Sequence, residues 1–135
     1  MSWLRLCAII FFAWGVAFAI LPRFVNELVG VDYIVNLHAE DWERIAGLLM
    51  FAPAFLLEAA HRSSNAEVRR TIARGVLIST LGCALLMTYW QLIPDGRWNR
   101  IDVINVVLLY GISYVLFVES ELVGWRLPLP LAGRA

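Results

Sequence analysis

Lysine is absent from this chain, and charged residues of either sign are sparse. Only 16% of the residues are charged and 61% are hydrophobic, and the mean hydropathy is +0.72. A soluble domain is usually about half apolar and about a quarter charged, so this composition indicates a protein whose solvent is lipid. The 11 arginines and 11 acidic residues cancel, so the net charge does not favour nucleic-acid binding.

Cysteine and histidine are too few and too scattered for the usual metal and redox sites. Cys7 and Cys83 lie far apart in apolar segments and form no Cys-x-x-Cys pair, which argues against a zinc or dithiol site and favours inert thiols. His38 and His61 lie outside the predicted spans, whereas a haem or pigment ligand is expected within one. No metal or cofactor is therefore predicted, although a lipid or quinone ligand stays open, as do the roles of the two histidines.

Catalytic signatures are missing as well. The chain contains no Ser-x-x-Lys, His-Glu-x-x-His or phosphate-binding loop. The pairs of acid, base and nucleophile that an active site requires are not visible in the sequence. The sequence therefore favours a non-enzymatic protein.

Four apolar segments are long enough to cross a membrane as helices. About 20 residues span the ~30 Å hydrocarbon layer, and the predicted spans cover approximately residues 3–21, 42–60, 71–93 and 101–118. Ala17-Phe-Ala19 resembles a signal-peptide cleavage site, but we expect the first span to be a retained helix. The predicted fold class is all-α: an integral membrane four-helix up-and-down bundle, built from one transmembrane domain over residues 1–135. An interfacial segment, helical or extended, is expected between spans 1 and 2, over residues 22–43.

A basic stretch over residues 62–74 interrupts the apolar sequence and predicts the turn between two membrane hairpins. With four spans, this turn and both termini share one side of the membrane. That side holds seven of the 11 arginines, namely Arg5, Arg62, Arg69, Arg70, Arg74, Arg126 and Arg134. The positive-inside rule then predicts cytoplasmic termini in a bacterial inner membrane.

The second span is unusually short between its charges. Thirteen residues separate Arg44 from Glu58, and a helix of that length covers roughly 20 Å, less than the hydrocarbon layer. Glu58 is therefore expected to be partly buried and paired, with Arg74 as the first candidate partner and Arg5 as the second. Pro53 is expected to kink this helix.

Small residues recur at helical spacing in two spans and predict surfaces for close helix packing. These surfaces consist of Ala8, Gly15 and Ala19 in the first span and of Gly75, Ser79 and Cys83 in the third. An aromatic stripe of Phe11, Trp14 and Phe18 is interpreted as lipid contact. A polar stripe in the fourth span, formed by Asp102, Asn105, Ser113 and Ser120 with Tyr110 beside it, is expected to face the bundle.

A candidate intramembrane cluster of polar and charged residues combines members of all four spans: Arg5, Glu58, Arg74, Asn105, Tyr110 and Glu119. The charged members are predicted to lie at similar depth. Mutual neutralisation is the favoured interpretation, because an ionisable group in hydrocarbon costs several kcal/mol unless it is paired. A proton or anion site is the alternative.

The layout resembles the DoxX-like small four-helix integral membrane proteins. The resemblance lies in Trp3-Leu-Arg-Leu leading into a span that stops at Pro22, in Arg44-Ile-Ala-Gly-Leu-Leu opening the second span, and in the short basic turn before the third. It implies a compact up-and-down bundle, and some members of that family are linked to redox or quinone-associated complexes. No catalytic residue is carried over from the family.

Two functions follow from these features. The first is a non-enzymatic accessory or structural subunit, whose partners are membrane lipids and other integral membrane subunits, with no nucleic acid. The second is a small carrier or quinone-linked redox protein that uses the Glu58 region and the polar stripe of the fourth span. A solid interior with a flat apolar outer face would favour the subunit, whereas a cavity between spans 2 and 4 would favour the carrier.

Overall fold

The computed structural model of this chain describes residues 2–28, 37–92 and 100–121. These residues form the helices α1 (Trp3–Ile20), α2 (Pro22–Leu28), α3 (Leu37–Leu49), α4 (Phe51–Arg62), α5 (Ala66–Leu92) and α6 (Arg100–Glu119). The predicted all-α fold class is confirmed. Within the interfacial segment the structure describes α2 and the start of α3, both helical, whereas residues 29–36 lie outside the described part.

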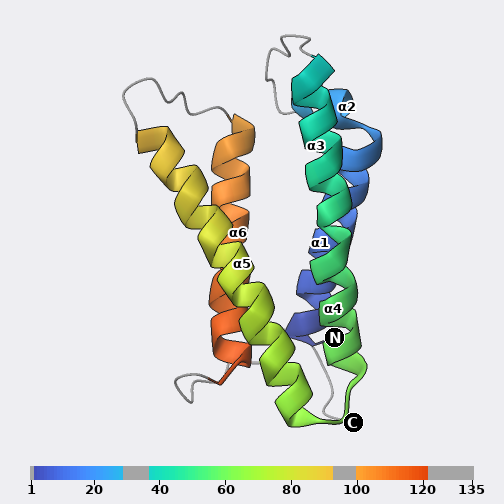
Figure 1. Cartoon of the computed structure of the whole chain (residues 1–135), viewed down its shortest axis with the longest axis vertical. Coiled ribbons are helices and arrows are strands. Elements are labelled where there is room, and N and C mark those ends of the chain that lie inside the picture. Colours follow the sequence, from blue (N-terminus) through green and yellow to red (C-terminus); the bar gives the residue numbers. More distant parts are fainter. Residues whose placement is uncertain (1, 29–36, 93–99, 122–135) are drawn as a thin grey trace.

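In the part of the chain that the structure describes, four helical stretches are long and apolar enough to cross a membrane, and the protein is therefore a multi-pass membrane protein. They are Trp3–Ile20, Asp41–Arg62, Ala66–Tyr89 and Asp102–Glu119, so α3 and α4 together form one span. Figure 1 shows two antiparallel hairpins, in which α1 lies beside α3 and α4, and α5 lies beside α6. We call these the first and the second hairpin.

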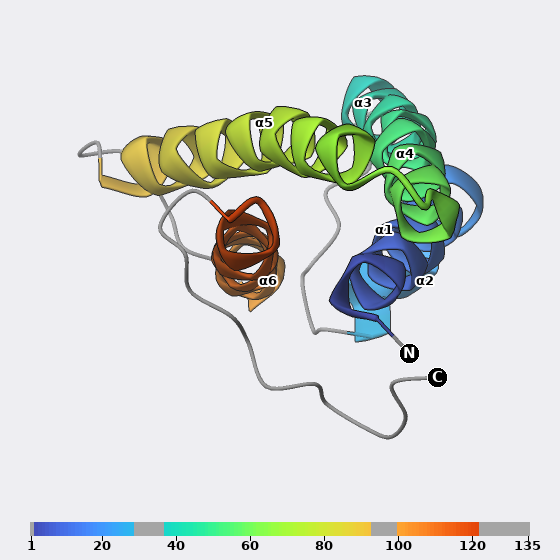
Figure 2. The same ribbon diagram turned by 90° about the horizontal axis from the view of Figure 1, so that it is seen from below.

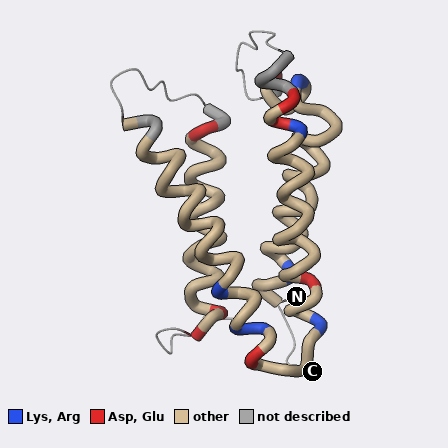
Figure 3. The backbone as a smooth tube through the Cα atoms, viewed as in Figure 1, with Lys and Arg blue, Asp and Glu red and all other residues tan. Residues whose placement is uncertain are grey.

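Charged residues of the described segments gather toward the two ends of the bundle and leave the middle of the spans apolar (Figure 3). This is the distribution that a hydrocarbon layer imposes, because an unpaired charge within it is costly. We call the end that holds Ser2, the turn between α4 and α5 and the end of α6 the N-terminal end, and the other the opposite end. Which end faces the cytoplasm stays a prediction.

The first hairpin is held by a close approach of α1 and α3 at two glycines. A Cβ atom added to Gly47 would lie 2.5 Å from the backbone nitrogen of Ala19, and one added to Gly15 would lie 2.9 Å from the carbonyl oxygen of Gly47. Any side chain there would push the two backbones apart. The small-residue surface of α1 therefore lies against α3, and Ala8 on the same surface is buried.

The second span is interrupted at Met50, between α3 and α4, rather than at Pro53 itself. A proline ring clashes with the carbonyl of the residue four positions earlier, which is Leu49, and the missing N–H removes the hydrogen bond to that carbonyl. The helical path still continues, since the Met50 nitrogen bonds to the Ala46 oxygen at 3.2 Å and the Ala54 nitrogen to the Met50 oxygen at 3.3 Å.

The second hairpin begins earlier than the sequence predicted. Most of the basic stretch is helical, because α5 starts at Ala66 and only residues 63–65 form the turn. Asn65 is the reason: its Oδ1 accepts hydrogen bonds from the backbone N–H groups of Glu67 at 2.9 Å and Val68 at 3.4 Å, which satisfies the first turn of the helix. The arginines that follow are good helix formers.

The predicted packing surface of the third span does not contact another helix of the described chain. A Cβ atom added to Gly75 would meet nothing within 4 Å, and Ser79 and Cys83 are exposed. The helix instead buries a face that includes Val76, Thr80 and Ala84. That face is displaced from the prediction by one residue, or about 100° of helix rotation. Within this chain the expectation for Gly75, Ser79 and Cys83 was therefore wrong.

The two hairpins come together at the N-terminal end and diverge toward the opposite end. In Figure 1 the ribbon of α5 starts beside α4 and then inclines away from the first hairpin along its length. Figure 2, seen from below, shows α6 and α1 on the same side of α5. The main contacts between the hairpins are those of α4 with α5 and of α1 with α6.

Candidate functional site

A cavity of about 280 Å³ lies between the two hairpins. We call it the inter-hairpin cavity. It is bounded by α1, by α3 and the residue that follows it, by α5 and by α6, so that all four spans contribute. Its lining residues are Ile10, Phe11, Trp14, Phe18, Glu43, Ala46, Met50, Met87, Asp102, Asn105, Leu108, Leu109 and Ile112.

Polar groups of the cavity lie toward the opposite end of the bundle. Glu43 belongs to the first turns of α3, and Asp102 and Asn105 belong to the first turns of α6. Asn105 accepts a hydrogen bond of 2.8 Å at Oδ1 from the indole Nε1 of Trp14, which connects α6 to α1. Part of the predicted polar stripe of the fourth span, Asp102 and Asn105, thus faces the cavity.

Glu43 is positioned by α2. The side-chain amide of Asn26 donates to both carboxylate oxygens of Glu43, at 3.2 Å and 3.1 Å, and Asn26 is only 2% exposed. A buried amide needs a partner, so this contact fixes the carboxylate relative to α2. The sequence did not identify either residue. An asparagine inside a short, otherwise amphipathic interfacial helix is the signal that could have found them.

The rest of the wall is apolar and adaptable. Met50 and Met87 face the cavity from different hairpins, and an unbranched thioether can fill irregular space in several rotamers. Phe11 is 6% exposed and Phe18 is 5% exposed. The cavity therefore combines an apolar body with a polar rim, which is the usual construction of a small-molecule site.

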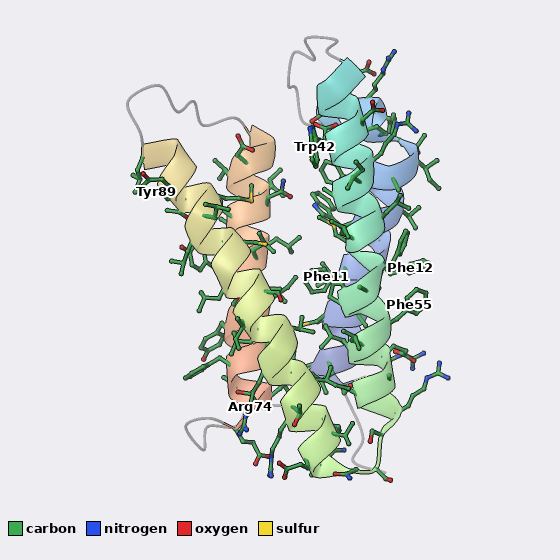
Figure 4. The ribbon with its side chains drawn as sticks, in the orientation of Figure 1. Phe11, Phe12, Trp42, Phe55, Arg74 and Tyr89 are labelled. Atoms are coloured by element: carbon green, nitrogen blue, oxygen red, sulfur yellow. The ribbon has the colours of Figure 1, made fainter. Side chains whose placement is uncertain are left out.

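The aromatic stripe of the first span faces inward, contrary to the expected lipid contact. Phe11 points into the space between the hairpins, whereas Phe12 and Phe55 point away from it (Figure 4). The outward aromatic contacts are those of Phe12 with Phe51 at 5.4 Å and with Phe55 at 6.5 Å between ring centroids. The stripe turns inward because α3 and α4 occupy the small-residue face of α1, which leaves the adjoining face toward α6.

The second hairpin carries its own polar contacts. Ser113 of α6 donates to Thr80 Oγ1 of α5 at 3.0 Å in a buried position, and the hydroxyls of Tyr110 and Thr88 lie 3.2 Å apart. These hydrogen bonds explain why polar side chains of the fourth span face α5. These hydrogen bonds hold α5 and α6 together, and the four side chains that form them do not line the inter-hairpin cavity.

The predicted cluster of charges is divided between separate places. Glu58 lies 2.8 Å from Arg62 Nε, one turn along its own helix, and 3.8 Å from Arg5 Nε. Arg74, the expected first partner, instead donates to the carbonyl oxygen of Ser120 at 3.4 Å. The choice of Arg74 as the partner of Glu58 was therefore wrong. Arg74 contacts the end of α6, whereas Arg62 stands four residues after Glu58 on the same helix, the spacing that brings two side chains together. The labelled Arg74 lies low in Figure 4, beside the end of α6.

Glu119 and His61 share a second cavity, of about 240 Å³, at the N-terminal end. We call it the polar end cavity. Its lining residues are Ser2, Leu4, His61, Ala66, Arg69, Arg70, Glu119 and Glu121. The Ser2 hydroxyl lies 2.7 Å from His61 Nδ1, and an ion pair joins Arg70 and Glu121.

Among the described residues, no group of three His, Cys, Asp or Glu side chains could hold a metal ion. No protein-family model, curated protein or solved structure matches the chain. Of the resemblance to DoxX-like proteins, the four-helix layout with spans able to cross a membrane is therefore what the structure supports.

Proposed function

We propose that this multi-pass membrane protein binds a lipid-soluble amphiphile in the inter-hairpin cavity and acts as a small carrier or quinone-linked redox protein. The observation that carries the proposal is the cavity itself, which lies between the second and fourth spans and also touches the first and third. A solid interior would have favoured a purely structural subunit.

The chemistry of the wall supports an amphiphile over a small polar solute. Phe11, Met50 and Met87 offer apolar contact along the body of the cavity, where burial of ligand surface is worth about 25 cal/mol per Å². The rim offers the oxygen acceptors of Glu43 and Asp102 and the amide of Asn105. A ligand with an apolar body and a hydroxyl, amine or carbonyl head would satisfy both parts.

Glu58 does not belong to this site. It lies near the N-terminal end in contact with Arg62 and Arg5, whereas the polar rim of the cavity lies toward the opposite end. The proposed function therefore relies on Asp102 and Asn105 of the fourth span and on Glu43, and assigns Glu58 a structural role.

The test compares two alanine-to-phenylalanine variants within the same span. Ala46 lines the cavity, and Ala52 is exposed and does not line it. Each protein is purified in a mild detergent, and bound small molecules are measured by native mass spectrometry. We expect the wild type and Ala52→Phe to retain a lipid-soluble amphiphile, and Ala46→Phe to lose it. Equal retention by Ala46→Phe, or an empty wild-type protein after mild purification, would contradict the proposal.

An accessory subunit of a larger membrane assembly is the second candidate, and the outer face of α5 favours it. Added Cβ atoms at Gly75 and Gly82 would meet nothing within 4 Å among the described residues, and Ser79 between them is exposed. Such a smooth strip permits close approach of a partner helix. A Gly75→Leu, Ser79→Leu double variant should then lose co-purifying membrane proteins while its thermal stability does not fall. Unchanged co-purification would rule out this face as the contact.

A further inference from the structure

The polar end cavity is separate from the inter-hairpin cavity, because no residue of the described segments lines both. It lies where four helix ends meet: α1 begins at Trp3, α4 ends at Arg62, α5 begins at Ala66 and α6 ends at Glu119. These are also the ends of the four candidate spans. The cavity is therefore at the depth of the lipid headgroups, with water on its outer side.

Both signs of charge face this cavity. Arg70 and Glu121 are already paired with each other. Arg69 is exposed, and its guanidinium makes one long contact of 3.5 Å to the carbonyl oxygen of Ser63. Glu119 is half-buried, and within residues 2–28, 37–92 and 100–121 no hydrogen bond or ion pair is made to its carboxylate. Arg69 is also the cation whose charge acts on the Glu119 carboxylate, so a ligand with both charges would insert between two side chains of opposite charge.

The helix ends reinforce this separation of charge. α5 begins at the cavity and carries Arg69 in its first turns, so the positive end of the helix dipole and a guanidinium favour an anion on that side. α6 ends at the cavity with Glu119, so the carbonyl end of the helix and a carboxylate favour a cation on the other side. A ligand with one charge only would be repelled by one of the two sides.

We propose that the polar end cavity binds a zwitterionic aminoalkyl phosphate, with the phosphate at Arg69 and the primary ammonium at Glu119. This chemistry occurs as the headgroup of phosphatidylethanolamine and as free phosphoethanolamine. The cavity of about 240 Å³ has the volume of several water molecules, since one water occupies about 30 Å³ in the liquid. It is therefore large enough for a headgroup of this size.

A primary ammonium fits the lining better than a quaternary one. Choline has no N–H group to donate to a carboxylate, and proteins recognise it with aromatic cages. Among the described residues, the lining contains no Phe, Tyr or Trp. An ethanolamine headgroup can instead form charge-assisted hydrogen bonds to Glu119.

The test uses the full chain in detergent, with native mass spectrometry of added lipids that carry identical acyl chains. We expect phosphatidylethanolamine to bind more tightly than phosphatidylcholine. Glu119→Gln should reduce the affinity for phosphatidylethanolamine by about tenfold, the loss expected for one charge-assisted hydrogen bond, and should reduce the affinity for phosphatidylcholine by less, because choline has no N–H group to donate. Arg69→Gln should weaken both lipids, because both carry the phosphate.

Glu67→Gln is the matched control. Glu67 lies in the first turn of α5, is exposed and does not line the cavity, so this variant should behave as the wild type does. Competition by free phosphoethanolamine would identify the soluble compound as a ligand, and binding of the lipid alone would identify the headgroup. Equal affinity of the wild type for the two lipids would overturn the proposal, even if Glu119→Gln fails to fold. So would identical behaviour of Glu119→Gln and Glu67→Gln.

Discussion

Trp14 and Asn105 join the two hairpins across the inter-hairpin cavity through one hydrogen bond of 2.8 Å from the indole nitrogen to the side-chain oxygen. The two residues are 91 positions apart in the sequence, and their helices belong to different hairpins. The bond is half-buried in a wall that is otherwise largely apolar, where such a contact is stronger than in water. It limits how far the hairpins separate around the cavity.

Removing the donor of this bond should destabilise the protein. Trp14→Phe keeps an aromatic ring but leaves Asn105 Oδ1 without its partner, so we expect the free energy of unfolding to fall by about 1 kcal/mol. Asn105→Leu in the same protein should recover part of the loss, because no unsatisfied amide then remains. Thermal unfolding in detergent of both single variants and the double variant measures the coupling. Additive effects would mean that the bond does not hold the hairpins.

Two glycine-to-alanine changes should have opposite effects. In Gly47→Ala the new methyl group meets the backbone of Ala19 at 2.5 Å, so α1 and α3 must separate, at a cost of about 1–3 kcal/mol. In Gly75→Ala the methyl group meets nothing within 4 Å among the described residues, and the better helix propensity of alanine should stabilise α5 by up to about 1 kcal/mol. Thermal unfolding of the two variants and the wild type measures the order of their stabilities. A stabilised Gly47→Ala would show that the hairpin is looser than described.

The sequence predicted the four membrane helices because hydropathy and turn signals are local properties. It could not predict which face of each helix points inward. The third span offered two adjoining faces, one through Gly75 and Ser79 and the other through Val76 and Thr80, and only the position of α6 selects the second. The same limit explains why Phe11 was expected in lipid although it lines a cavity.

The candidate site was partly predictable for the same reason. A polar stripe on the fourth span indicated that Asn105 would face protein, because an amide in lipid is unfavourable. The cavity depends on the divergence of two hairpins, which no local pattern encodes. The partner of Glu58, in contrast, was predictable from the sequence. Arg62 stands four residues later on the same helix, and the spacing rule for helical ion pairs could have identified it.

A double-mutant cycle should therefore assign Glu58 to Arg62. Glu58→Gln combined with Arg62→Gln should show a small favourable coupling, since the pair is close but partly exposed, at 27% and 75% of the two side chains. Coupling to Arg5 should be weaker at 3.8 Å, and coupling to Arg74 should be absent. Thermal unfolding at low and high salt measures these values. A larger coupling to Arg74 than to Arg62 would restore the original expectation.

The orientation in the membrane can be tested at two exposed positions on opposite ends of the bundle. Glu27 lies in α2 and Ser64 lies in the turn between α4 and α5. Because more arginines lie at the N-terminal end, Ser64→Cys should be protected from an impermeant thiol reagent added to intact cells, and Glu27→Cys should react. A Cys83→Ala background removes the exposed native thiol. Labelling of position 64 alone would invert the orientation.

Glu121 has a backbone φ of 53°, in the left-handed region, two residues after the end of α6 at Glu119. A residue with a Cβ atom is disfavoured there by about 1–2 kcal/mol, whereas glycine is not. The Glu121 side chain compensates through its ion pair with Arg70, but both groups are more than one-third exposed, at 43% and 38%, so the pair contributes at most about 1 kcal/mol. We therefore expect Glu121→Ala to lower the free energy of unfolding, because it removes the ion pair and keeps the strain.

Glu121→Gly removes the same ion pair and relieves the strain, so it should be more stable than Glu121→Ala by about 1 kcal/mol. Glu67 supplies the control, because it lies in the first turn of α5, where helical backbone favours alanine. Glu67→Gly should be less stable than Glu67→Ala by about 1 kcal/mol, the reverse order. Thermal unfolding of the four variants in one detergent measures both differences. If glycine is the less stable replacement at both positions, the end of α6 does not hold Glu121 in a left-handed conformation, and the Arg70 contact then has no strain to offset.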